Sequence, residues 1–185
     1  EGGELRIAGV GVNPTRIGFL GVLARMGAAV TLEGQEDQFH EPIADLIARP
    51  AMLRGTEVAA GEIPGLIDEI ALLAALATRA RGTTIFREVG ELRVKESNRL
   101  GLIARNIQAI GGTAEAVGND LHVEGSTGPL RGKVYTDGDH RIAMAFAVLG
   151  TASGARIRVD DMACAAVSFP GFPEMLTAIQ VSGKR

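Results

Sequence analysis

The chain has 185 residues and a formal net charge of -3, with no tryptophan and one tyrosine. This length allows a full buried core, which must here be built from Val, Ile, Leu and Ala. Charges of both signs are interspersed and no apolar run reaches the length of a transmembrane helix, so neither nucleic acid nor membrane is an expected partner.

A strand-like run that follows a glycine occurs three times, after Gly3, Gly82 and Gly154. The first two runs lead into helical patterns over residues 14–26 and 98–110, in which apolar side chains recur on one face. Asn13 and Pro14 predict the N-cap and the first helical residue of the earlier helix.

Extended segments follow each helix, and a second, more apolar helix closes each unit. Turn residues at 118–120 predict a hairpin between two alternating runs. The apolar helices begin at Pro64 and Asp139, and they must be buried by stacking on neighbouring units. Residues 32–62 are less regular, and we interpret them as a strand pair. Their apolar side chains still need burial: Ile43, Leu46, Ile47 and Leu53. The sequence thus predicts an α/β chain of about two and a half repeat units.

The single cysteine, Cys164, excludes an intrachain disulfide and indicates a reducing compartment, so we expect a cytoplasmic protein. Its apolar neighbours in MACAAV favour an inert, buried thiol over a nucleophile. The three histidines lie far apart, without Cys or His at metal-ligand spacing. No metal site is therefore predicted.

Arginines recur in or near the first turns of the predicted helices, at Arg16, Arg99 and Arg141. Repeated units bring equivalent helix ends to one side of the molecule, where guanidinium groups and free backbone N–H groups can bind an anion together. For Arg16 we favour a bridge between neighbouring units. For Arg99 and Arg141 we favour the anion site.

Lys95, Glu96 and Arg99 crowd the start of the helix predicted over residues 98–110. Their spacing would place them along one helix edge. Cations are unfavourable at this positive end of the helix dipole. Either they form a solvent-tolerated ion pair worth less than about 1 kcal/mol, or they face a small anion with Glu96 as a proton donor and acceptor.

Asp139, His140 and Arg141 stand together at the start of an apolar helix. Asp139 could cap the helix, and a lone histidine is more often a capping or core residue than a ligand. Their company with Arg141 favours a functional site. Asp68 lies in a turn before the other apolar helix, which is expected to aim its carboxylate outward, whereas Glu69 suits the helix dipole.

Five segments in this order resemble the EPSP synthase family, the enolpyruvylshikimate-phosphate synthases: GVGVNPTRIGFLGVLARMGA, IPGLIDEIALLA, LRVKESNRL, DGDHRIAMAFAVLG and SFPGFPEML. The resemblance covers essentially the whole chain, and the RVKE and DHR segments are together its most specific part. It implies that residues 1–185 are a C-terminal portion, with the N-terminal half absent. The implied fold is an inside-out α/β barrel of βαβαββ units, one of two similar domains.

The resemblance also implies a reaction without metal or organic cofactor. The 5-hydroxyl of shikimate 3-phosphate attacks C2 of phosphoenolpyruvate while C3 is protonated, and phosphate then leaves as C3 loses a proton. Asp68 would help to deprotonate the hydroxyl, and Glu96 would give and take the proton at C3. Four residues would bind phosphoenolpyruvate and stabilise charge in the transition state: Lys95, Arg99, His140 and Arg141.

This chain departs from the family pattern in two ways. Val167 stands where some members have a lysine, so one phosphate-facing cation is absent. The N-terminal half, which supplies a catalytic lysine and most groups that bind the shikimate phosphate, is also absent, so residues 1–185 alone should be inactive. Two alternatives are a UDP-N-acetylglucosamine enolpyruvyl transferase, against which RVKESNRL and the lack of a loop cysteine argue, and a non-catalytic anion-binding domain.

Overall fold

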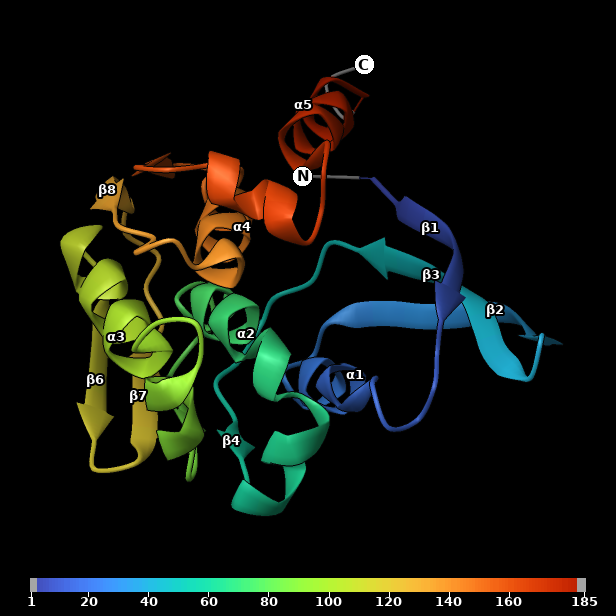
Figure 1. Ribbon diagram of the computed structural model, residues 1–185, viewed down its shortest axis with the longest axis horizontal. Helices are drawn as coiled ribbons and strands as arrows, with labels where there is room; N and C mark the ends of the chain where they lie inside the picture. The colour runs from blue at the N-terminus through green and yellow to red at the C-terminus, as the bar shows by residue number, and fades with distance from the viewer. Residues whose placement is uncertain (1–2, 183–185) are drawn as a thin grey trace.

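In the computed structural model, which describes residues 3–182, strands and helices follow one another in repeated units (Figure 1). The first unit contains β1 (Leu5–Gly11), α1 (Gly18–Arg25), β2 (Ala29–Gln38), β3 (Glu41–Arg49), β4 (Glu57–Val58), the 3-10 turns η1 (Ala60–Gly65) and η2 (Ile67–Glu69), and α2 (Ile70–Ala77). The second contains β5 (Thr83–Phe86), η3 (Gly90–Val94), α3 (Arg99–Ala109), β6 (Thr113–Val117), β7 (Asp120–Glu124), β8 (Arg131–Val134) and α4 (His140–Leu149). β9 (Arg156–Val159), η4 (Ala163–Val167) and α5 (Phe172–Ser182) follow. The predicted order of strand, helix, strand pair and helix is confirmed.

Two short strands connect successive units. β4 pairs with β5 in parallel, and β8 pairs with β9 in parallel. A short strand at the end of one unit therefore joins the first strand of the next. The resulting sheets have the orders β1-β3-β2, β4-β5-β7-β6 and β8-β9. Neither β4 nor β8 was predicted, and β4, with two residues, is too short to carry a recognisable periodicity.

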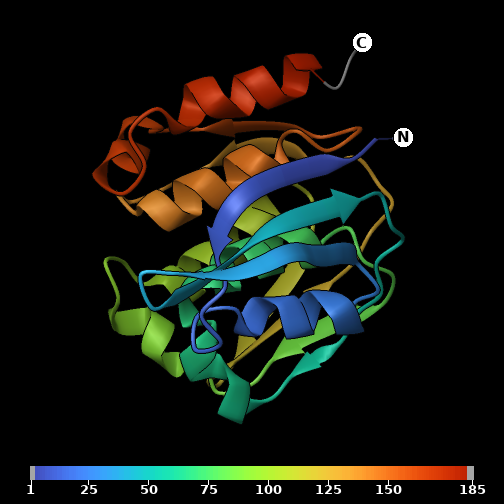
Figure 2. The same cartoon turned by 90° about the vertical axis from the view of Figure 1, so that its right-hand side faces the viewer.

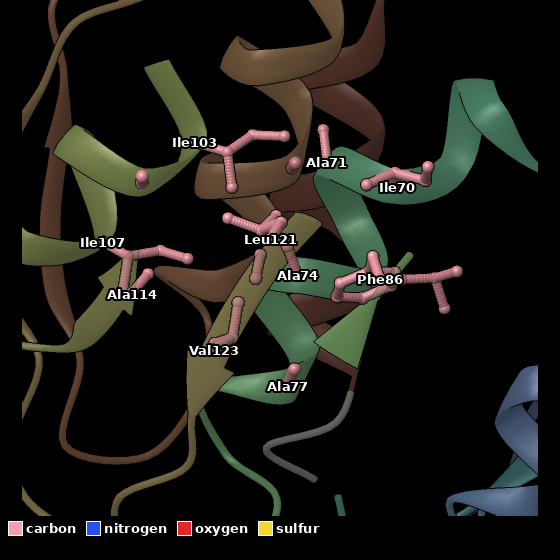
Figure 3. Close-up of a cluster of buried hydrophobic side chains, with 14 of the residues drawn as sticks. Ile70, Ala71, Ala74, Ala77, Phe86, Ile103, Ile107, Ala114, Leu121 and Val123 are labelled. Carbon is pink, nitrogen blue, oxygen red and sulfur yellow. The ribbon is translucent and has the colours of Figure 1, made fainter. Parts of the chain in front are cut away.

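The core lies between the β4-β5-β7-β6 sheet, which we call the middle sheet, and the helices that cover it (Figure 3). Side chains alternate along β7, so that Leu121 and Val123 are buried while His122 between them is partly exposed. Phe86 on β5 joins them, and Ile103 and Ile107 contribute one face of α3. The predicted hairpin is confirmed, since β6 and β7 pair antiparallel around the turn at 118–119.

The first sheet is antiparallel and lies on another side of the molecule, with α1 on one side of it and α5 on the other (Figure 2). Its central strand β3 buries Ile47 and partly buries Ile43 and Leu46, so the strand pair predicted within residues 32–62 is confirmed. Its register shifts in β1 between Ile7 and Val10, where Gly9 has a φ of +64°. A bulge of this kind requires a residue that tolerates the left-handed region.

The first predicted helix was placed too early. The α-helix begins at Gly18, four residues after Pro14, so Pro14 is not its first residue. Asn13 caps a separate turn instead, because its Oδ1 accepts the N–H of Thr15 at 3.0 Å and its carbonyl accepts that of Arg16 at 2.8 Å. The side-chain bond competes with helix formation here.

The helix predicted from Pro64 also begins later, at Ile70. Two 3-10 turns precede it, and Leu66 between them has φ -151° and ψ 13°, which interrupts the helical path. Asp68 therefore lies in a short turn and not on the α-helix. α2 packs against both α3 and α4.

Candidate active site

Arg99 and Asp139 form a buried ion pair that joins the start of α3 to the start of α4. Arg99 Nε donates to Asp139 Oδ2 over 2.8 Å and Nη2 donates to Oδ1 over 3.2 Å, and both side chains are fully buried. Asp139 is also the N-cap of α4, where its Oδ1 accepts the N–H groups of Arg141 and Ile142. Ser97 Oγ donates to Oδ2 over 2.9 Å. One carboxylate thus fixes both helix ends.

Lys95 and Glu96 precede α3, so the expectation that they share a helix edge with Arg99 is wrong. The helix begins after Asn98, whose Oδ1 accepts a backbone N–H of the first turn at 3.1 Å. Glu96 is half-exposed and its carboxylate pairs with Arg99 Nη2. Lys95 Nζ lies 2.7 Å from Oε1 of Glu91. The side chains of Lys95 and Glu96 therefore extend from the irregular segment that connects η3 to α3.

Asp68 lies between two guanidinium groups. Arg141 Nη1 donates to the Asp68 carbonyl over 2.9 Å, and Nη2 lies 3.2 Å from Asp68 Oδ2. On the other side, Arg99 Nη1 lies 3.9 Å from Asp68 Oδ1. This nitrogen is buried and has no hydrogen-bond partner among residues 3–182. An unsatisfied buried donor is costly, so Arg99 presents an unused charged donor toward Asp68.

The structure links four of the six predicted site residues in one network: Asp68, Glu96, Arg99 and Arg141. Lys95 is adjacent in the chain but pairs with Glu91. His140 is the first residue of α4 and partly buried, and within residues 3–182 its side chain makes no hydrogen bond or ion pair. Arg99, expected at an open helix end, is instead fully buried because Asp139 compensates its charge.

Sequence reasoning missed two residues of the network. Ser97 was not singled out, and Asp139 was considered as a helix cap but not as the partner of Arg99. The cap could be recognised because Asp139 immediately precedes an apolar helical pattern. Its pairing with Arg99 joins residues 40 positions apart, and no local pattern indicates such a contact.

The carboxyl groups differ in their environments. Burial alone would raise the pKa of Asp139, but hydrogen bonds and charge from Arg99, with the Ser97 hydroxyl, lower it below its ordinary value. Burial raises the pKa of Glu69, which neighbouring Arg141 only partly counteracts. The site therefore combines a carboxylate that is held charged with one whose charge is disfavoured.

A cavity of about 260 Å³ opens beside the network, between α2, α4 and the start of α5. Asp68, Glu69 and Arg141 lie on its polar side, while Leu72 and Val148 contribute to its apolar lining. A second cavity, of about 130 Å³, also reaches Asp68 from the side of the first unit. Asp68 is thus accessible from two directions.

A family model described as EPSP synthase (3-phosphoshikimate 1-carboxyvinyltransferase) matches residues 1–176 of this chain. The chain belongs to the EPSP synthase family.

Relatives in this family cover nearly the whole chain. The 3-phosphoshikimate 1-carboxyvinyltransferases of Desulforamulus reducens and Geobacter sulfurreducens are each 44% identical over 181 residues, which is 97% of this chain and 42% of each protein. A structure of EPSP synthase from Acinetobacter baumannii is similar, with a TM-score of 0.87 and 32% identity over 96% of this chain and 42% of that one. The chain thus spans about 42% of the length of these relatives.

The likeness confirms the α/β fold predicted for an EPSP synthase family chain. The enolpyruvyl transferase NikO from Streptomyces tendae shares this fold, with a TM-score of 0.73 at 24% identity over 95% of this chain and 38% of that one. Because the fold alone does not determine the function, the function depends on the side chains of the site.

Two further features of the EPSP synthase family chain concern its reactive groups. Within residues 3–182, no three His, Cys, Asp or Glu side chains are grouped to hold a metal ion. Cys164 is partly and not fully buried, its Sγ donates to the Asp161 carbonyl, and burial raises its thiol pKa. This environment favours the inert thiol over the thiolate nucleophile.

Within residues 3–182, no helix has the length and apolar character needed to cross a membrane.

Proposed function

We propose that this chain is the C-terminal part of an EPSP synthase, which transfers the enolpyruvyl group of phosphoenolpyruvate to the 5-hydroxyl of shikimate 3-phosphate. The observation that carries the proposal is the arrangement of two carboxylates on one buried arginine. Glu96 pairs with Nη2 of Arg99, and Asp68 lies 3.9 Å from Nη1, which makes no hydrogen bond within the described residues. Two carboxylates that can exchange protons, those of Asp68 and Glu96, thus lie next to the guanidinium of Arg99.

The proposed roles follow from charge and access. Asp68 is partly exposed and borders both cavities, so it can accept the proton of an acceptor hydroxyl that lies against it. The hydroxyl oxygen then bonds to C2 of phosphoenolpyruvate. Glu96, half-exposed, gives a proton to C3 and takes one back when the C2–phosphate bond breaks. Phosphate leaves and the vinyl double bond is restored.

Arg99 and Arg141 would hold the anionic groups of phosphoenolpyruvate. Arg99 is positioned rigidly by Asp139, so its remaining donors need no reorganisation when negative charge develops. Arg141 currently pairs with Asp68, and an incoming anion would compete for its guanidinium. Lys95 and His140, placed beside these arginines in the chain, are proposed as further contacts of this substrate. The remaining groups belong to the N-terminal part of the longer relatives.

The decisive test uses a chimera, in which this chain replaces the matching segment of the Desulforamulus reducens relative. We expect phosphate release from shikimate 3-phosphate and phosphoenolpyruvate by the chimera and none by the chain alone. Glu96→Gln in the chimera should lower kcat by about 10²-fold or more, the usual contribution of a general acid or base. Glu115→Gln is the matched control, because Glu115 is exposed on β6.

Three results would contradict the proposal. A folded chimera that binds phosphoenolpyruvate without turnover would favour the non-catalytic anion-binding domain. A chimera whose activity survives Glu96→Gln unchanged would exclude Glu96 from proton transfer at C3. Turnover with UDP-N-acetylglucosamine in place of shikimate 3-phosphate would identify the other transferase.

A further inference from the structure

The first and second units contain the same short motif after their first strands. Residues 15–18 read Thr-Arg-Ile-Gly, and residues 98–101 read Asn-Arg-Leu-Gly. Arg16 therefore corresponds to Arg99. Each motif lies at the start of the first helix of its unit, α1 or α3, and the apolar helix α2 or α4 follows later in the unit. Units with the same order of strands and helices place equivalent residues in equivalent positions.

Arg16 lies beside the start of α2, as Arg99 lies beside the start of α4. It lines the 130 Å³ cavity together with Asp68 and Glu69. The backbone there is closely packed, because a Cβ on Gly18 would lie 3.0 Å from the carbonyl oxygen of Gly65. The turn that carries Arg16 is thus held against the turn that precedes α2.

The two arginines differ in their partners. The first turns of α2 and α4 match at Ile70 and Ile142, so the position of Asp139 in the second unit corresponds to Ile67 in the first. Because Ile67 has no carboxylate, it cannot pair with Arg16 as Asp139 pairs with the buried Arg99. Arg16 is exposed, and among residues 3–182 its side chain has neither an ion pair nor a hydrogen bond.

The nearby acidic side chains do not neutralise Arg16. Asp68 already pairs with Arg141. Glu69 Oε1 lies 3.9 Å from Nη1 of Arg141, and within residues 3–182 it forms no ion pair with Arg16. Arg16 therefore keeps an uncompensated guanidinium at the polar cavity. This finding argues against the bridge between units that its position in the sequence suggests.

We propose that Arg16 is a further substrate-binding residue, which contacts an anionic group of the acceptor beside Asp68. The inference rests on the proposed function. Asp68 borders two cavities, one containing Arg141 and the other Arg16. Phosphoenolpyruvate is assigned to the side of Arg141 and Arg99, so an acceptor whose hydroxyl reaches Asp68 extends toward Arg16. Its carboxylate or phosphate then meets the free guanidinium.

The test is steady-state kinetics of the chimera with Arg16→Ala and Arg16→Lys. For Arg16→Ala we expect KM for shikimate 3-phosphate to rise by about 10-fold to 100-fold, the loss typical of one charged hydrogen bond. KM for phosphoenolpyruvate and kcat should stay within about twofold, and Arg16→Lys should recover part of the affinity. Arg158→Ala is the matched control, since Arg158 is an exposed arginine on β9.

Calorimetric titration with shikimate and with shikimate 3-phosphate identifies the group that Arg16 contacts. Weaker binding of both by the Arg16→Ala chimera assigns the carboxylate, and weaker binding of the phosphorylated compound alone assigns the phosphate. An unchanged KM for the acceptor overturns the inference. So does a fall in kcat that comes with a lower melting temperature in both Arg16 variants. If Glu96→Gln still abolishes turnover, the proposed function survives that failure.

Discussion

The carboxylate of Asp139 accepts two hydrogen bonds from the guanidinium of Arg99, and both side chains are fully buried. The pair fixes the position of the Arg99 guanidinium. It leaves Nη1 of Arg99 toward Asp68 and connects the first turn of α3 with that of α4. The Arg99–Asp139 pair therefore contributes both to the stability of the chain and to the arrangement of the site, and mutations can separate these two contributions.

Asp139→Asn should destabilise the chain strongly. The amide oxygen can still cap α4, but the buried charge of Arg99 would keep only its ion pair with the half-exposed Glu96 and the longer one with Asp68, at 3.9 Å. Removing one partner of a buried ion pair costs about 3–5 kcal/mol, and we expect the lower end of this range in the free energy of unfolding, measured with urea. Asp137→Asn, an exposed aspartate in the same turn, is the control and should change little. A loss below about 1 kcal/mol for Asp139→Asn would contradict the buried-pair argument.

The contribution of Asp139 should disappear in acid. Its pKa in the folded chain lies below the ordinary value of 3.8, since the Arg99 guanidinium outweighs the effect of burial. The unfolded chain then binds more protons in this window, so stability rises with pH. The contribution is complete above the unfolded pKa and is lost as pH falls through the folded one. We therefore expect the difference in unfolding free energy between wild type and Asp139→Asn to shrink below about pH 4. A difference independent of pH down to pH 2 would be incompatible with this linkage.

Elements with strong local signals were predictable from the sequence. The capped helix at Asp139 and the hairpin at 118–119 have side-chain patterns that specify them alone. The late start of α2 was not predictable, because the backbone of Leu66 departs from the helix within an otherwise helical pattern. Strand β4 is two residues long and forms only because β5 is beside it.

The site residues were found by resemblance and charge, but their connections were not. Arg99 looked like an exposed cation at a helix end, since the sequence alone does not show that Asp139 lies against it. The same reasoning treated Arg16 as a bridge between units. Only the cavity and its neighbours show that Arg16 is exposed while its counterpart Arg99 is buried. Tertiary packing, and not local pattern, decides which of two similar arginines keeps a free guanidinium.

Gly125→Ala should weaken the attachment of the middle sheet to α2. A Cβ at this position would lie 1.8 Å from the carbonyl oxygen of Ala80, a backbone atom that cannot rotate away. Overpacking of this kind usually costs about 1–3 kcal/mol, and we expect at least the upper value in urea unfolding. Gly61→Ala is the control, because nothing lies within 4 Å of its added Cβ. Equal stabilities of the two variants would show that the loop after β7 moves freely.

Asp68→Asn should separate chemistry from stability. The Asp68 side chain is 37% exposed and its pair with Arg141 is also partly exposed, so its removal should change the unfolding free energy by less than about 1 kcal/mol. As the proposed proton acceptor, however, it should lower kcat of the chimera by about 10²-fold to 10⁴-fold. Asp45→Asn is the matched control, because Asp45 is also an aspartate in an ion pair with an arginine, Arg6, on the first sheet. If Asp68→Asn raised only KM for phosphoenolpyruvate and left kcat intact, Asp68 would serve to orient Arg141, and another group would have to accept the hydroxyl proton.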